Sequence, residues 1–551
     1  MDTKDVVISG GGPAGLMLAC ELRLAGLDVL VVERLLEIDP TIKAGSVNLP
    51  TAEAFYRRGL LPALQEAQRQ AFEQMMAFRA QQSGAGGPGR AGGSGGAGGS
   101  GRKAGGAPPA GHFAGIMVSS ATVDFEDPEF RDAGPARSVF AVAQQTVEAV
   151  LGAYAAELGV ELRRGVELTN FTTDDEGVTV HLSNARVNDR IVDNPLVDNP
   201  LVDNPLVDNA GGESDAGSVR AGWLVGCDGG RSLVRKIAGF DFPGTEPAIT
   251  GRQAIVELEG AEGLQSSWNY TSTGVYAHGP VPGRVLTVEF DGPPEDRDAP
   301  ITAEEIQGSL RRVTGVDVTV TAVKSATRFT DNARQVTSYR KGRVLLAGDA
   351  AHVHSPFGGQ GLNLSIGDAV NLGWKLAATI QGTAPEGLLD TYTTERHPVG
   401  EWVLDWTRAQ IALMRTDFRT AALRSVVTDL LRTPSGSTYL AKKLSGVLHR
   451  YPIDGEHELT GSAAPDFEFA DGTRLGEHLS DGKPLLLDLA DSADLREVAS
   501  GRVRVLTTKY AGELTGVLVR PDGYVAWAAD DGTVTGLDVA LSTWVPGVRQ
   551  D

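Results

Sequence analysis

The chain has 551 residues, of which 41% are hydrophobic and 22% are charged, a composition typical of a globular protein with a buried core. Asp and Glu number 71 against 50 Lys and Arg, and the net charge of −21 disfavours nucleic acid and anionic membranes as partners. The chain has only two cysteines, which excludes a disulfide framework, a thiol-based zinc site and a Cys-x-x-Cys pair. No apolar run is long enough to span a bilayer, and no signal-peptide pattern is evident. We therefore expect a cytoplasmic protein of several domains, monomeric or homodimeric.

The chain is expected to begin with a strand, a glycine loop, a helix and a second strand, over residues 5 to 33. The loop reads Gly-Gly-Gly-Pro-Ala-Gly, and Glu33 lies 18 residues beyond its last glycine. In such a loop Gly10 permits the tight turn, Gly12 lets the backbone approach a pyrophosphate, and Gly15 lets helix and strand pack closely. The helix N-terminus offers N–H groups to phosphates, and Glu33 can accept hydrogen bonds from a ribose. The pattern predicts a dinucleotide site, with a ligand-free glycine turn as the alternative.

Two segments have biased compositions. Residues 83–111 are rich in Gly, Ala and Ser and show no hydrophobic periodicity, which predicts a flexible insertion. Residues 191–210 repeat a Val-Asp-Asn-Pro unit, and each Asn before Pro favours extended backbone. We interpret both as expanded surface loops, with a mobile lid as the alternative for the first.

The remaining elements are coarser expectations. We expect one helix over 144–158, antiparallel strands over 160–226, and a β-rich region with little helix over 240–325. A buried strand over 343–348 should be followed by a glycine loop and a helix to residue 380. Residues 398–450 should be mostly helical, and residues from 483 onward should form a small α/β domain.

A second chemical motif follows the buried strand and runs from Gly348-Asp349 to Gly361-Leu362-Asn363. Asp349 ends the strand and can accept hydrogen bonds from ribityl hydroxyls, while the glycines let backbone approach a flat ring. The helix that begins near Gly361 directs its positive end at the loop, where it can stabilise negative charge on reduced flavin. Leu362 and Asn363 would supply the backbone N–H groups. The motif therefore favours FAD over NAD.

The same stretch has a metal-site alternative. Asp349, His352 and His354 are spaced D-x-x-H-x-H, which is a possible ligand pattern. A metal site would leave the glycine loop and the following helix unexplained. We therefore expect no metal.

A third motif, Gly226-Cys227-Asp228-Gly229-Gly230-Arg231-Ser232, lies between the other two. With three motifs in this order the chain resembles the group A flavoprotein aromatic monooxygenases, which share the p-hydroxybenzoate hydroxylase fold, and particularly the polyketide-tailoring aromatic hydroxylases. The resemblance covers about residues 5–400 and extends weakly to 518–527, which is similar to the family's thioredoxin-like tail. That tail lacks Cys-x-x-Cys here, so it should be structural.

The resemblance implies an α/β fold with a Rossmann-like FAD-binding domain of the glutathione-reductase type. This discontinuous domain would comprise residues 1–75, 112–240 and 325–400. A β-rich substrate domain would follow over 241–324, with the glycine-rich insertion 83–111 attached to it. Residues 401–551 would form a helical connector and a thioredoxin-like C-terminal domain.

The resemblance also implies the residues that hold FAD. They are Gly10, Gly12, Pro13, Ala14, Gly15, Glu33, Arg34, Lys43, Gln144, Asp228, Asp349, Pro356, Gly359, Gly361, Leu362 and Asn363. Pro356 would lie near the reactive N5/C4a region of the flavin. Lys43 stands where many relatives carry Arg, so it keeps the charge but loses the bidentate fork. Phe357 is larger than the residue usual at its position and is expected to press on flavin or substrate.

Four aromatic or imidazole side chains of the β-rich region are candidates for the substrate pocket: Trp268, Tyr270, Tyr276 and His278. Alternation along half-buried strands predicts that about half of them face outward. Trp402 and Trp406 are spaced i, i+4 on an expected helix and are expected to be core residues.

The implied reaction uses NADPH or NADH as a transient reductant of FAD. Oxygen would then form a C4a-hydroperoxyflavin that transfers one oxygen atom to a polycyclic aromatic substrate of polyketide type, as in antibiotic biosynthesis. Because the flavin supplies this chemistry, no catalytic acid or base is assigned. Baeyer–Villiger insertion or oxidative ring cleavage is one alternative, and a flavin dehydrogenase without oxygenase activity is another. The string W-x-W-x-I-P, typical of flavin-dependent halogenases, is absent.

Overall fold

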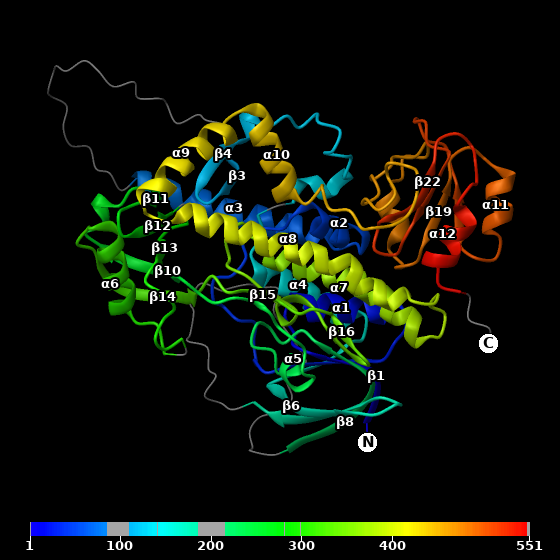
Figure 1. Cartoon of the computed structure of the whole chain (residues 1–551), viewed down its shortest axis with the longest axis horizontal. Helices are drawn as coiled ribbons and strands as arrows, with labels where there is room; N and C mark the ends of the chain where they lie inside the picture. Colours follow the sequence, from blue (N-terminus) through cyan, green and yellow to red (C-terminus); the bar gives the residue numbers. More distant parts are fainter. Residues whose placement is uncertain are drawn as a thin grey trace.

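The computed structural model describes residues 2–84, 109–139, 141–185, 215–279, 281–297 and 299–547. The centre of the glycine-rich insertion and the Val-Asp-Asn-Pro repeat lie outside these residues, so the expectations for them are not tested. Two long helices, α7 and α8, run through the middle of the molecule, with a green β-rich lobe at one end and a red C-terminal lobe at the other (Figure 1). None of the helices described is long and apolar enough to cross a membrane.

The first domain is built on an eight-stranded mixed sheet. Its path runs β16 (Arg340–Lys341), β17 (Val344–Leu346), β8 (Asp215–Gly226), β1 (Asp2–Ser9), β2 (Val29–Glu33) and β5 (Glu161–Arg164). Off this path, β7 (Val178–Asn184) pairs with β8, and β6 (Val166–Thr173) pairs with β7. The central strands β1 and β2 are parallel and buried, as their continuous apolar runs predict.

The expectation of antiparallel strands over 160–226 is only partly right. β6, β7 and one edge of β8 do pair antiparallel, but β5 pairs parallel with β2 and β8 pairs parallel with β1. Short strands reveal their alternation in sequence but not their partners, which are set by the tertiary fold.

Helices cover the faces of this sheet. α1 (Pro13–Leu24) packs against α4 (Gln144–Glu157) and against α7 (Gly361–Ile380). α2 (Leu49–Arg57) and α5 (Leu233–Ile237) are short helices that follow the loops after β2 and β8. The strand, helix and strand predicted for residues 5 to 33 are therefore present.

The second domain is a five-stranded antiparallel sheet, ordered β11 (Ser267–Tyr270), β12 (Gly274–His278), β13 (Arg284–Glu289), β10 (Thr250–Glu259) and β14 (Thr319–Phe329). Helix α6 (Ala303–Thr314) packs on one face of it, through Ile306, Leu310 and Val313. The sequence reading of this region as having little helix missed α6. The sequence does contain signals for this helix, because Thr302 caps its N-terminus and Gly315 ends it in a left-handed conformation. A small sheet of β9 (Gly244–Thr245), β15 (Ala333–Gln335) and β18 (His352–Val353) joins the two domains.

The ends of the glycine-rich insertion are regular structure, which corrects its expected bounds of 83–111. Helix α3 (Leu61–Gly84) continues to residue 84, and strand β3 (Pro109–Phe113) begins at residue 109 and pairs with β4 (Ile116–Ser119). The segment between these two elements is shorter than composition alone suggests.

The C-terminal part contains α8 (Thr391–Met414), α9 (Phe418–Leu431) and α10 (Pro434–Ser445), followed by a four-stranded sheet. The sheet order is β20 (Arg504–Thr507), β19 (Leu485–Asp488), β21 (Gly516–Val519) and β22 (Val525–Ala529), with helices α11 (Ala493–Ala499) and α12 (Leu537–Trp544). Buried Arg520 joins this domain to α8, because it donates two hydrogen bonds to Glu395 at 2.7 and 2.8 Å.

Candidate active site

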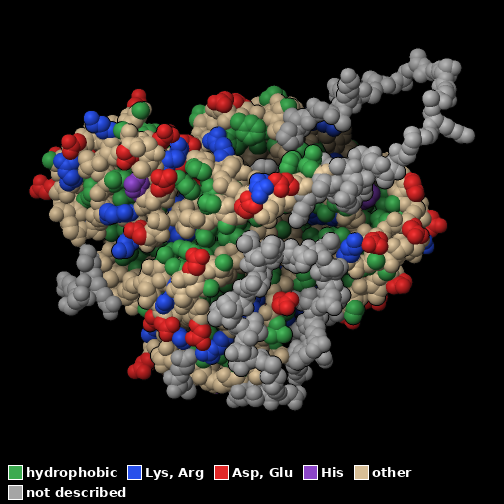
Figure 2. Space-filling view, turned by 180° about the vertical axis from the view of Figure 1, so that it is seen from behind, with side chains coloured by type: hydrophobic (Ala, Val, Ile, Leu, Met, Phe, Trp, Pro, Cys, Tyr) green, Lys and Arg blue, Asp and Glu red, His purple; other side chains and the backbone are tan. Residues whose placement is uncertain are grey.

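A cavity of about 1450 Å³ lies between the loops of the first domain and the antiparallel sheet of the second. One half is lined by the loops after β1, β2 and β17, and the other by side chains of β3, β10, β11, β13, β14 and α10. On the face of the molecule shown in Figure 2, acidic and basic side chains are interspersed, so the excess of acidic residues does not gather there in one patch.

Of the four glycines in the loop after β1, Gly12 is an open position and the other three are crowded. Gly10 has φ +109°, and a Cβ there would lie 2.3 Å from the Cys227 carbonyl oxygen. A Cβ on Gly15 would lie 1.9 Å from the Gly10 carbonyl oxygen. A Cβ on Gly12, by contrast, would have no protein atom within 4 Å. Gly10 and Gly15 thus serve the turn and the packing, while Gly12 leaves space in the cavity.

That open space meets the start of α1. Gly12 is the N-cap residue of this helix, and no side chain caps it. The N–H groups of the first turn and the positive end of the helix are therefore available to an anionic group. Pro13 and Ala14 line the cavity at the same place. This cradle fits a diphosphate.

Glu33 is fixed at the next part of the wall. Its Oε2 accepts a hydrogen bond from the Gly11 N–H at 2.7 Å, and its Oε1 accepts one from the Leu35 N–H at 2.9 Å. The carboxylate is acceptor-only and keeps further lone pairs for hydroxyl groups. Arg34 also lines the cavity here.

Lys43 and Gln144 lie together on the same side. Burial disfavours the Lys43 charge, but Asp39 at 2.9 Å, Glu148 and Asp349 outweigh it and raise the pKa of Lys43. Lys43 is therefore a permanent cation in this wall. Gln144 donates from its side chain to Glu148 at 2.8 Å.

The glycine loop after β17 presents Asp349 to the cavity, with an exposed side chain. The predicted cofactor residues Pro356, Gly359, Gly361 and Leu362 line the same loop and the start of α7. α7 also lacks a side-chain cap at its N-terminus. The arrangement can stabilise negative charge on a flat ring placed beside it.

Asn363 also lines the cavity, but its side chain has a structural task. It accepts a hydrogen bond from the Asn48 N–H at 2.8 Å and donates one to the Gly359 carbonyl oxygen at 2.9 Å. These two bonds hold the segment before α2 against the glycine loop. Only its backbone N–H is left for the predicted contact.

His352 belongs to a buried network. Its Nε2 lies 2.7 Å from Asp368, whose carboxylate also accepts from the Gly348 N–H at 3.0 Å and from Arg396 at 2.8 Å. The part of the chain that the structure describes contains no group of three His, Cys, Asp or Glu side chains arranged to hold a metal. Asp349, His352 and His354 are thus not arranged as one set of metal ligands in the described structure.

The two carboxylate oxygens of Asp228 have different surroundings. Its Oδ2 accepts from the Leu233 and Val234 N–H groups at 2.7 and 3.1 Å and so caps α5, while its buried Oδ1 has no partner in the described structure. Burial raises the pKa of this carboxyl group. Asp228 also lines the cavity.

The second half of the cavity has an aromatic wall. The Phe357 ring lies 6.0 Å from Trp268 and 5.6 Å from Phe329, measured between ring centroids. All three line the cavity together with Leu286. Phe357 is 3% exposed, so its ring is held in the wall rather than swinging freely.

Of the four substrate-pocket candidates, only Trp268 lines the cavity. Tyr270 is on the same side of the sheet but is occupied: its hydroxyl donates to the Ala114 carbonyl, and the Arg424 guanidinium lies 3.8 Å from its ring centroid. Tyr276 is packed against the α6 side of the sheet, and His278, two residues on, is outside the cavity. The register between β11 and β12 therefore places Trp268 and Tyr270 on one face of the sheet and Tyr276 and His278 on the other.

Several cavity residues were not found from the sequence. They are His112 of β3, Gln253 of β10, Arg284 and Leu286 of β13, Phe329 of β14, and Leu444 of α10. The period-two pattern of β13 was the one usable signal, since it puts Arg284 and Leu286 on one face. The contributions of β3 and α10 depend on long-range packing, which leaves no local pattern.

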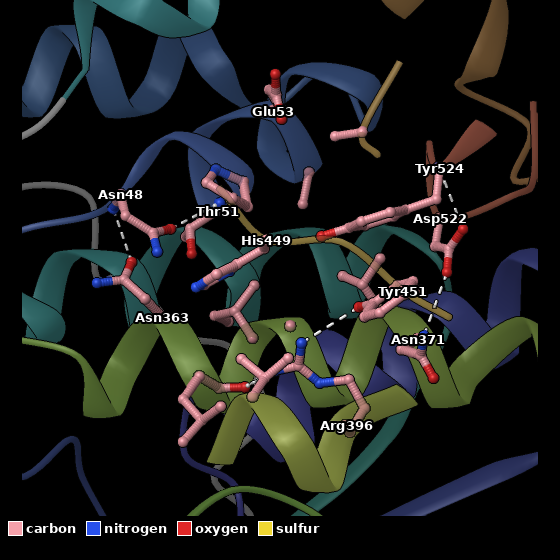
Figure 3. Close-up of a pocket in the computed structure, with 18 of the residues that line it drawn as sticks. Asn48, Thr51, Glu53, Asn363, Asn371, Arg396, His449, Tyr451, Asp522 and Tyr524 are labelled. Atoms are coloured by element: carbon pink, nitrogen blue, oxygen red, sulfur yellow. Dashed lines mark hydrogen bonds between the residues drawn. The ribbon is translucent and has the colours of Figure 1, made fainter. Parts of the chain in front are cut away.

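A second, much smaller chamber of about 30 Å³ is lined by residues of α2, α7 and α8 and by His449 and Tyr451 (Figure 3). Asn48, Gln360 and Asn363 belong to the walls of both spaces. Burial lowers the pKa of His449 to about 3, so this histidine is neutral, and its Nε2 has no partner among the described residues. The chamber has room for about two water molecules that could satisfy it.

Comparison with known proteins decides which family this site belongs to. Residues 3–193 and 198–407 match the FAD binding domain family, and residues 457–546 match the C-terminal domain of aromatic-ring hydroxylases. The chain belongs to the FAD-dependent aromatic-ring hydroxylases. FAD is the cofactor of this family, and the open position at Gly12 and the two uncapped helix N-termini fit it.

Individual relatives span the whole chain. A 12-dehydrotetracycline 5-monooxygenase/anhydrotetracycline 6-monooxygenase of Streptomyces rimosus is 38% identical, over 98% of each chain. A dialkyldecalin synthase of Streptomyces rugosporus is 35% identical, also over 98% of each chain. The solved structure of an anhydrotetracycline hydroxylase from Streptomyces rimosus is similar with a TM-score of 0.78 and 36% identity, covering 99% of this chain and 100% of that one. The protein is thus a flavin-dependent monooxygenase by family.

Proposed function

We propose that the protein uses NADPH or NADH and O₂ to insert one oxygen atom into a polycyclic aromatic substrate of polyketide type. The observation that carries the proposal is the large cavity, whose dinucleotide half opens into a wide aromatic half. Trp268, Phe329 and Phe357 provide flat apolar surfaces that suit fused rings. The similarity to monooxygenases named for tetracycline intermediates supports this substrate class.

The chain's own residues would hold FAD as follows. Gly12 and the start of α1 accommodate the diphosphate, Glu33 accepts hydrogen bonds from the adenosine ribose, and Asp349 accepts them from the ribityl chain. The N-terminus of α7, with Leu362, donates to the flavin edge that becomes negative on reduction. When bound, FAD would supply the chemistry of hydride acceptance from the nicotinamide and of O₂ activation. The apolar wall excludes water from the place where substrate meets the flavin.

The remaining predicted contacts are part of the same proposal. Lys43 offers charge without a bidentate fork, and Gln144 and Arg34 lie at the same wall. Pro356 lies in the glycine loop, immediately before Phe357. We expect the enzyme to act in the cytoplasm as a monomer or homodimer.

The test is the stoichiometry of the reaction with a panel of polycyclic phenols and quinones. NAD(P)H and O₂ consumption would be measured together with the mass of the product formed under ¹⁸O₂. We expect one labelled oxygen per product and no ring opening. A product with an opened or expanded ring would show the Baeyer–Villiger or cleavage alternative instead. A relative is named dialkyldecalin synthase, so a product of unchanged mass would show a redox-neutral reaction and refute the proposal.

A further inference from the structure

The sheet that walls the substrate half of the cavity has a small polar group among its apolar residues. Gln253 of β10 pairs in register with Leu286 of β13 and with Thr327 of β14. All three line the cavity, as does Arg284, which lies two residues from Leu286 on the same face of β13. The cavity face therefore carries a guanidinium and an amide beside its aromatic wall.

The opposite face of the same sheet pairs its arginines with carboxylates. Arg252 contacts Glu289 at 2.6 Å and Glu305 at 2.8 Å. Arg312 contacts Glu289 at 2.7 Å, and Arg328 contacts Glu305 at 2.5 Å. These three arginines, including Arg328, which also lines the cavity, are thus paired with carboxylates.

Arg284 differs from them. No acceptor for its side chain is found among the described residues, and burial lowers its pKa with no carboxylate to offset the effect. The buried Gln253 Nε2 also has no acceptor in the described structure. His112 nearby in the cavity adds no charge, since burial lowers its pKa to about 4. Leaving a guanidinium and an amide without acceptors is costly unless a ligand supplies them.

The position of these groups gives the substrate an orientation. Leu286 and Val288 belong to the apolar cluster that contains Phe357. Arg284 lies about 7 Å from Leu286 along β13, in the direction away from Val288. Arg284 pairs with Ile255, so Gln253 is its diagonal neighbour on the same face of the sheet.

We propose that Arg284 and Gln253 together bind an anionic oxygen at the end of the substrate remote from the glycine loop. The substrate class is then a polycyclic aromatic acid, with an ionised phenol, an enolised dicarbonyl or a carboxylate at that end. The guanidinium neutralises the oxyanion, and the Gln253 amide donates a second hydrogen bond. This inference rests on the proposed function and specifies which ring systems the enzyme accepts.

The test measures binding rather than turnover. FAD-loaded protein at pH 8 is titrated with 1,8-dihydroxyanthraquinone, with its dimethyl ether and with anthraquinone-2-carboxylate, and the difference spectrum gives the dissociation constant. We expect the wild type to prefer the phenol or the carboxylate over the ether, and a bound phenol to show the red-shifted phenolate band. Which of the two acids is preferred identifies the source of the oxyanion.

The variants are Arg284→Met and Arg284→Lys, with Arg334→Met as the matched control. Arg334 pairs with Glu246 outside the cavity. We expect Arg284→Met to weaken binding of the preferred acid by about 10- to 100-fold and to abolish the phenolate band. Arg284→Lys should recover part of the affinity, and the control should bind as the wild type does. FAD content reports that each variant is folded.

Two results overturn the inference while the proposed function stands: equal wild-type affinity for acids and ether, or an Arg284→Met protein that retains FAD and the full preference. Wild-type protein that binds none of the three ring systems contradicts the proposed substrate class itself, and the inference with it.

Discussion

Substituting glycines of the first loop should separate cofactor binding from folding. At Gly12 the backbone has φ −78° and ψ −173°, which any residue adopts, and a Cβ would meet no protein atom within 4 Å. A valine there fits the apoprotein and fills the space proposed for the diphosphate. We therefore expect Gly12→Val to fold and to lose FAD.

The magnitudes differ between loop positions. A valine that displaces the diphosphate breaks at least two charge-assisted hydrogen bonds of about 1.5–3 kcal/mol each, which weakens FAD binding by about 100- to 10,000-fold. The free energy of unfolding of the apoprotein should change by less than about 1 kcal/mol. At Gly15 a Cβ would lie 1.9 Å from the Gly10 carbonyl oxygen, so Gly15→Ala should cost about 3 kcal/mol or more before any cofactor is added.

The assay pairs two measurements on each apoprotein. FAD is titrated and binding is followed by quenching of flavin fluorescence, and urea unfolding is followed by tryptophan fluorescence. Gly152→Val is the matched control, because Gly152 of α4 also has open space at its Cβ and lies outside the cavity. A Gly12→Val protein that binds FAD as tightly as the wild type, or an equally stable Gly15→Ala protein, would refute the reasoning.

Three further changes test the packing around the site. Arg520→Met removes the bidentate partner of buried Glu395 and should lower the free energy of unfolding of the C-terminal domain by about 3–5 kcal/mol in urea. The control Arg502→Met removes a partly exposed ion pair and should lower the free energy of unfolding by less than about 1 kcal/mol. Burial opposes the charge of Glu395, but Arg520 and Lys375 outweigh burial and lower the pKa of Glu395 to about 2 from 4.5. The ionised carboxylate therefore contributes about 3 kcal/mol to the free energy of unfolding above pH 4.5, and this contribution should be lost as pH falls toward 2. An unfolding free energy that is flat over this range would contradict the assignment. Phe357→Ala opens the aromatic wall and should raise NADPH oxidation without substrate several-fold and release more hydrogen peroxide; an unchanged peroxide yield would remove this ring from the control of water access.

The parts of the site that could be predicted from sequence are those in which function and local backbone geometry coincide. Gly10, Gly12 and Gly15 lie within six residues, and their spacing fixes the turn between β1 and α1. Asp349 and the start of α7 are likewise separated by a short loop. Such motifs can be recognised in a sequence because every participating atom comes from one short segment of chain.

The substrate half could not be predicted in the same way. Trp268, Gln253, Arg284 and Phe329 come from four strands, and their common face depends on the register between those strands. A shift by one residue would reverse every side chain, which is why Tyr276 was a candidate and yet packs against α6. Composition identified the aromatic residues, but only strand pairing decides which of them face the cavity.

The C-terminal domain has no residue in the large cavity, yet its contacts lead to the glycine loop. Tyr451, which precedes the domain's first strand, stacks on Tyr524 and accepts a hydrogen bond from Arg396 at 3.2 Å. Arg396 also binds Asp368, and Asp368 accepts the Gly348 N–H beside Asp349 (Figure 3 shows the Arg396–Tyr451 contact). Each link is buried and hydrogen-bonded, so a displacement at one end is opposed at the other. A tail without redox cysteines can therefore matter to flavin binding by holding α7 and α8 in place.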